Sequence, residues 1–205
     1  MFLDSLLGAL RDRIQLWRSP GSRTALERQE VYLQGQKVTN RHWETHDTPE
    51  GAVTTRVATT GPVKETVAPL PEDMMAGVRE MAGHALMFVR DHLPGFDTAS
   101  WSLQDLDDAF ANWIARGDHA SCPPEIVEQI VGSAFGEFCA RQLDMHWILV
   151  TDAHGTAAAI EGDGSGARYK TMRSFPFAAV SKRIASGEAH FLVPIYRVIK
   201  GDIAD

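Results

Sequence analysis

Pairs of neighbouring apolar residues recur every four residues through the middle of the C-terminal half. The pairs are Ile126/Val127, Ile130/Val131, Ala134/Phe135 and Phe138/Cys139. Steps of four return to nearly the same side of an α-helix, so the pattern predicts a helix from Pro123 to about Gln142 with one broad buried face. Gly132 and Gly136 lie one turn apart on it, and each costs the helix about 1 kcal/mol relative to alanine. We expect another element to pack closely against them.

Three other segments have helical spacing and helix-start signals. Pro71 is followed by two acidic residues, an arrangement that suits the first turn of a helix. Ser102 and Asp105 are spaced as a capping box, and Pro176 suits the start of the third segment. The predicted helices cover residues 72–92, 103–116 and 175–186.

Short apolar runs bounded by turn residues predict strands. Residues 146–151 and 156–161 flank a turn-forming segment and are typical of a β-hairpin. Residues 190–199 are predicted to form the last strand, with Pro194 marking an edge or a bulge. Residues 53–67 alternate with period two around Gly61-Pro62, which predicts a second hairpin.

The N-terminus carries an amphipathic stripe. Leu3, Leu7, Leu10, Ile14 and Trp17 share one side of a helix, whereas an early acidic residue and the lack of a basic leader argue against a secretion signal. We expect this helix to dock on the domain, on a partner or on a membrane surface, and the sequence leaves the three open.

These elements predict an α+β fold in which helices pack on a small, mainly antiparallel sheet. Residues 101–205 are expected to form the α+β domain. Residues 1–100 are expected to form an N-terminal extension with the amphipathic helix, the hairpin and helix 72–92.

Composition and charge restrict the function classes. The chain is 44% hydrophobic and 23% charged, which excludes global disorder. Its net charge is −7, and this disfavours binding to nucleic acid. The two cysteines, Cys122 and Cys139, are separated by a predicted helix, so a cytoplasmic location is favoured over a disulfide-bonded one.

Five short motifs follow one another in the C-terminal half. They are Gly132-Ser-Ala-Phe-Gly-Glu137, Leu143-Asp-Met-His-Trp147, Thr151-Asp152 with Gly155, Phe175-Pro176, and Ser181-Lys-Arg-Ile184 with Gly187-Glu188. In order and spacing they resemble the bacterial family known as domain of unknown function 3806, over roughly residues 105–198. The resemblance implies a fold unit and brings no activity, cofactor or catalytic residue with it.

Cys122 and His119 are the candidate catalytic pair. Cys122 stands at a predicted helix start, where backbone N–H groups and the helix dipole favour a thiolate, and His119 could serve as its base. However, the two prolines that follow remove two of those donors. The alternatives are a structural thiol and a nucleophile.

His42 and His46 are weak candidates for a metal site. Their i, i+4 spacing would place both on one face of a helix, but tryptophan stands where the zinc-protease motif requires glutamate. The sequence therefore predicts no metal and no cofactor. Asp105, Asp107 and Asp108 are explained by the dipole of the predicted helix 103–116.

A basic segment offers a candidate binding surface. Between Asp163 and Glu188 the charged residues are all basic and aromatic residues are interleaved with them, which suits an anion or an acidic partner. The binding candidates are Arg168, Lys170, Arg173 and Lys182; Arg183 is expected to form a structural ion pair.

The sequence favours a noncatalytic bacterial cytoplasmic module that binds another protein or an acidic ligand. Its surface would be the basic segment or the exposed edge of the Pro194 strand, and self-association is a further alternative. The competing hypotheses are a thiol-dependent enzyme using Cys122 with His119, and an anion- or nucleotide-binding protein using residues 168–183.

Overall fold

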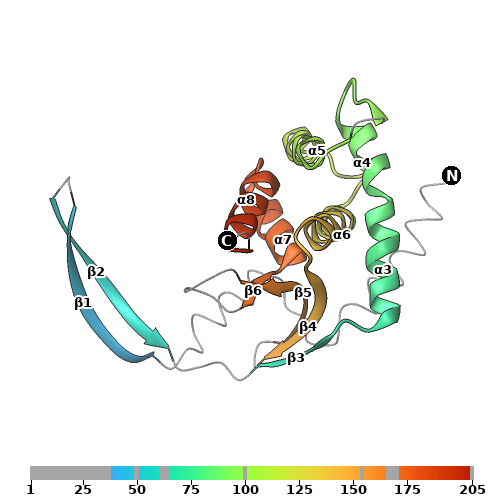
Figure 1. Ribbon diagram of the computed structural model, residues 1–205. Coiled ribbons are helices and arrows are strands. Elements are labelled where there is room, and N and C mark those ends of the chain that lie inside the picture. Colours follow the sequence, from blue (N-terminus) through green and yellow to red (C-terminus); the bar gives the residue numbers. More distant parts are fainter. Residues whose placement is uncertain are drawn as a thin grey trace.

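The computed structural model in Figure 1 describes residues 38–48, 51–60, 65–98, 101–152, 155–164 and 171–203. It confirms the α+β class, with a four-stranded antiparallel sheet beside a group of helices. The N-terminal stripe from Leu3 to Trp17 lies outside the described residues, as do Arg168 and Lys170.

The helix predicted by the four-residue repeat is present as α6 (Pro124–Gln142), and it lies at the centre of the group of helices. It packs most extensively against α3 (Glu72–Gly83) and α7 (Pro176–Ser186), and also contacts α4 (Ala85–His92) and α5 (Leu103–Arg116). Figure 1 shows α6 between α3 and α7, and because so many elements touch it, its buried residues extend well beyond one face.

The glycines of α6 permit this close packing. A methyl group on Gly132 would lie 2.7 Å from Cδ1 of Phe177, and one on Gly136 would overlap the indole of Trp147. The helix therefore accepts two poor helix formers because a strand and a neighbouring helix approach its backbone there.

The predicted helix 72–92 is two helices that meet at His84. The backbone N–H of His84 bonds the carbonyl of Met81 at 3.0 Å, a tighter turn than the α-helical one. Gly83 ends the first helix and weakens the helix at this point. Helix 103–116 is confirmed, with a reciprocal capping box between Ser102 and Asp105 and a left-handed Gly117 at its end.

The sheet has the strand order β3-β4-β5-β6 and all neighbours are antiparallel. Its strands are β3 (Thr66–Pro69), β4 (His146–Asp152), β5 (Gly155–Asp163) and β6 (Thr171–Ser174). The predicted hairpin of residues 146–161 is confirmed as β4 and β5. The short fourth strand, β6, was not predicted from the sequence.

The prediction of a hairpin over residues 53–67 is wrong, because the two predicted strands do not pair with each other. The hairpin joins β1 (Val38–Thr48) to β2 (Gly51–Thr60), so it turns near residue 50 and not at Gly61-Pro62. The second predicted strand contributes instead to β3, where Val67 pairs with Val150 of β4. Period-two alternation identified strand character correctly, but it carries no information about which strand is the partner.

The predicted last strand is also wrong, because residues 192–203 form helix α8 (Leu192–Ile203). Apolar residues recur at helical spacing in this segment and contact the core. They are Leu192, Ile195, Tyr196 and Ile199. Pro194 lies in the first turn of this helix, where proline is tolerated, and so marks no strand edge. The binding surface expected at the edge of a Pro194 strand is therefore absent.

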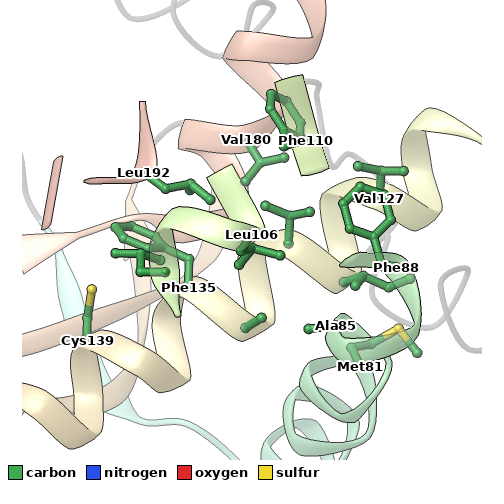
Figure 2. Packing of buried hydrophobic residues seen from close by; sticks show 14 of the residues in the cluster. Met81, Ala85, Phe88, Leu106, Phe110, Val127, Phe135, Cys139, Val180 and Leu192 are labelled. Carbon is green, nitrogen blue, oxygen red and sulfur yellow. The ribbon is translucent and has the colours of Figure 1, made fainter. Parts of the chain in front are cut away.

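One hydrophobic core extends across the expected boundary at residue 100. Figure 2 shows side chains from α3 to α8 gathered together, among them Met81 and Phe88 from before the boundary and Phe135 from after it. Strand β3 likewise pairs with β4. Residues 65–98 are thus part of the same packed unit as the C-terminal domain. Trp113 and Trp147 are both buried in this core.

Candidate functional site

The segment that holds Cys122 and His119 wraps around Trp113 of α5. The indole Nε1 of Trp113 donates a hydrogen bond to the carbonyl oxygen of Cys122 at 3.0 Å, and the His119 ring stacks on the indole with centroids 4.0 Å apart. A buried tryptophan needs one partner for its N–H, and this segment supplies it. The chemistry-bearing residues therefore contribute to holding the α5–α6 connection in place.

The electrostatic surroundings of Cys122 oppose a thiolate. Burial raises the pKa of its thiol to about 11, and the negative charge of Asp91 acts in the same direction. The group is thus protonated at neutral pH, whereas the nucleophilic form of cysteine is the thiolate. Within the described residues, Nδ1 of His119 is buried and has no hydrogen-bond partner, so no third group orients this imidazole as a base requires.

Beside this segment, α5 closes the end of α4. Arg116 donates to the carbonyl of Asp91 and to Nδ1 of His92 at 3.1 Å, and Asn112 donates to the carbonyl of His92 at 3.0 Å. Burial lowers the pKa of His92, and the guanidinium of Arg116 lowers it further. A neutral His92 can accept the hydrogen bond, so these contacts have a structural explanation as the C-terminal cap of α4.

Of the four basic binding candidates, the structure describes Arg173 and Lys182. Arg173 on β6 forms ion pairs with Glu161 and with Glu65, the latter at 2.5 Å, and these hydrogen bonds raise its pKa. Lys182 lies exposed on α7. The structural ion pair predicted for Arg183 is present, with Glu188 at 2.9 Å, and its guanidinium also covers the Phe191 ring. The charge of Arg173 is therefore already neutralised by two carboxylates.

The two histidine candidates lie in strand β1, where His42 pairs with Val57 and His46 with Val53. Residues four apart in a strand are about 13 Å apart along the chain, so the helical geometry behind a shared metal ion does not occur. Among the residues that the structure describes, no group of three His, Cys, Asp or Glu side chains is arranged to hold a metal ion.

The three acidic residues of α5 have three different roles. Asp105 completes the capping box of its own helix, whereas Asp107 is buried and caps a different one. Its carboxylate accepts hydrogen bonds from the backbone N–H groups of Phe191, Leu192 and Val193 at 3.0, 3.1 and 3.3 Å. Sequence reasoning missed this contact because 84 to 86 residues separate the partners.

Asp108 faces solvent in an open groove between α5 and the connection from α7 to α8. The groove has a volume of about 670 Å³ and is open to solvent. Its apolar lining comes from Leu93, Ala111, Ile114, Ala115, Gly187 and Ala189, and its polar lining from Asp108, Asn112 and His190. Asp108 accepts from Gln104 at 2.9 Å, and its Oδ1 lies 3.4 Å from Nδ1 of His190. The result is an apolar depression with one carboxylate at its border.

Comparison with known proteins identifies a family segment that contains most of the groove lining. Residues 108–196 match the family described as Domain of unknown function (DUF3806). The DUF3806 segment runs from Asp108 in α5 to Tyr196 in α8, so all the lining residues of the groove except Leu93 belong to it. Neither the curated proteins nor the solved structures contain a match to this chain. None of the described helices is long and apolar enough to cross a membrane.

Proposed function

We propose that this chain is a noncatalytic bacterial cytoplasmic interaction module and that it binds a short segment of a partner protein in the groove between α5 and the connection from α7 to α8. The observation that carries the proposal is the groove itself, which combines an apolar lining with one solvent-facing carboxylate. Interfaces are commonly built this way, with apolar contacts at the centre and polar groups at the rim.

The charge of the groove selects the chemistry of the partner. Asp108 is its carboxylate, and the histidine that faces it, His190, is 63% exposed on its side chain. A lysine or arginine of a partner can take the place of the exposed imidazole beside the Asp108 carboxylate. Both charged groups then stay near the solvent, so little desolvation opposes the contact. The overall charge of −7 also attracts basic segments. The expected ligand is a peptide with a basic residue next to small or aliphatic ones.

Selection from a displayed library of short random peptides tests this proposal. We expect the retained peptides to share a basic residue flanked by apolar ones. Ala115→Trp should abolish their binding, because Ala115 is exposed and lines the groove. Asp108→Asn should weaken binding about tenfold, which corresponds to ~1.4 kcal/mol.

Lys182→Trp is the matched control, since it adds the same bulky side chain to an exposed position of α7 outside the groove. It should leave the affinity unchanged. Selection of acidic peptides, or loss of binding in the Lys182 variant with normal binding in the Ala115 variant, would contradict the proposal. The former outcome would favour the basic segment as the binding surface.

A further inference from the structure

The sheet carries apolar side chains on the face opposite the helices. The helices contact one face of the sheet, where Trp147 and Ile160 join the main core and Leu149 packs against it. Side chains alternate along a strand, so Ile148 and Val150 point to the other face. The strand register places Val67, Pro69, Ala157 and Ala159 beside them. We call these six residues the outer face.

Part of the outer face is shielded from water within a single chain. Ile148, Val150 and Ala159 are 2%, 5% and 0% exposed and form a small cluster of their own, separate from the main core. The described helices that contact the sheet are on its opposite side, as Trp147 and Ile160 show. A cover that belongs to the same chain is therefore required.

The N-terminal stripe has the chemistry and the size of such a cover. Leu3, Leu7, Leu10, Ile14 and Trp17 lie on one side of a helix of about 21 Å at 1.5 Å per residue. Strand β4 has seven residues and is about 23 Å long. A helix can thus lie along the strands and cover the apolar band from end to end, as helices do in two-layer α+β folds.

We propose that residues 3–17 form a helix that docks on the outer face of the sheet of its own chain. The sheet then has helices on both sides, and the stripe gains the apolar surface that an amphipathic helix needs. Val67 lies at the border of the outer face and is 38% exposed. It should therefore lie beside the edge of the docked helix.

Photo-crosslinking from the rim tests this docking directly. p-Benzoylphenylalanine replaces Val67 in the full chain, and Leu86, 41% exposed on α4, receives the same group as the matched control. Equal amounts of isotopically light and heavy protein are mixed, so that the fragment masses separate bonds within one chain from bonds between two. We expect Val67→p-benzoylphenylalanine to link to residues 3–17 of its own chain and the Leu86 variant not to do so. A link to a second copy, a link to a different segment, or no link would overturn the proposal.

A pair of charge variants checks the face of the helix that docks. Leu7→Lys with Leu10→Lys places charges in the stripe, whereas Ser5→Lys with Asp12→Lys places them on the opposite side of the same helix. The first variant should bind a fluorescent apolar dye several times more strongly than the parent, because the outer face becomes exposed, while the second should match the parent. Equal dye binding by the two variants would contradict the docking. Peptide binding in the groove is unaffected by either result, so this proposal fails or stands separately from the proposed function.

Discussion

Replacing Asp107 removes the contact that joins α5 to the start of α8. The carboxylate accepts three backbone N–H groups, and two of them belong to the buried residues Phe191 and Leu192. In Asp107→Ala these two donors lose their partner in a place that water reaches poorly. The first turn of α8 also loses the negative charge that its positive end favours.

The size of the effect follows from the number of donors left without a partner. A buried polar group without a partner costs about 1–3 kcal/mol, so two give ~2–6 kcal/mol for Asp107→Ala. Asp107→Asn keeps a carbonyl oxygen that can accept from Phe191 and Leu192 but presents an amide to Val193, and about 1–2 kcal/mol is expected. Typical domains are stable by only ~5–15 kcal/mol, so the alanine variant should lose a large fraction of its free energy of unfolding.

Urea unfolding followed by circular dichroism measures these differences. The order of midpoints should be parent, then Asp107→Asn, then Asp107→Ala, with similar slopes. Asp108→Ala is the control at the next position, because Asp108 is 36% exposed and its contacts are at the surface; it should change stability by roughly 0.5 kcal/mol or less. Equal destabilisation by Asp107→Ala and Asp108→Ala would refute the assignment of Asp107 as the cap of α8.

Three further predictions concern close packing, the thiol and the ion pairs of the sheet. Gly136→Ala should destabilise the protein by a few kcal/mol in thermal unfolding, because the new methyl group overlaps Trp147. Gly83→Ala is the control: Gly83 lies in open space at a helix end, and its replacement should be neutral or slightly stabilising. The reverse order of stabilities would contradict the packing. Alkylation of Cys122, measured in a Cys139→Ala background, should be slow at pH 8 and accelerate toward pH 11, because burial holds the thiol protonated; a plateau near neutral pH would revive a nucleophilic role. Arg173→Met should lower the free energy of unfolding by about 1–2 kcal/mol, since Glu161 loses its ion pair with Arg173. Phosphate binding, measured by calorimetry, should be the same in this variant as in the parent. A loss of phosphate binding would instead support the basic segment as the binding surface.

Local signals in the sequence predicted much of the fold. The four-residue repeat of α6, the Ser102–Asp105 capping box and the turn between β4 and β5 each depend on neighbours within a few residues. Such patterns are visible in a single sequence because the physical partners are close along the chain. Even the small residues at Gly132 and Gly136 correctly indicated a close approach, although not the identity of Trp147 or Phe177.

The errors arose where the deciding partner is distant in the sequence. Residues 192–203 contain enough β-branched and aromatic residues to suggest a strand, but Asp107 caps their first turn and their helical stripe packs on the core. Strand β3 pairs with β4 across about 80 residues, a separation that no local pattern encodes. Tertiary packing decides which strands pair. It also brings Glu65 to Arg173, and these residues are far apart in the sequence.

The candidate site was predictable only in part for the same reason. The sequence shows Asp108 as one of three acidic residues in a predicted helix, but its place beside His190 depends on how α5 meets the α7–α8 connection. Cys122 and His119 were correctly seen as neighbours in the chain. Their contacts with Trp113, and the burial that keeps the thiol protonated, required the structure.

Chemical-shift mapping by NMR tests the proposed binding surface most directly. A library-selected basic peptide is added to isotopically labelled full-length protein, and the backbone amide shifts are followed. The largest changes should fall on Ala111, Ala115, Ala189 and His190 at the groove, and Ala115→Trp should abolish them. Changes centred on Lys182, or on His119 and Cys122, with the groove residues unmoved, would contradict the assignment of the groove as the binding surface.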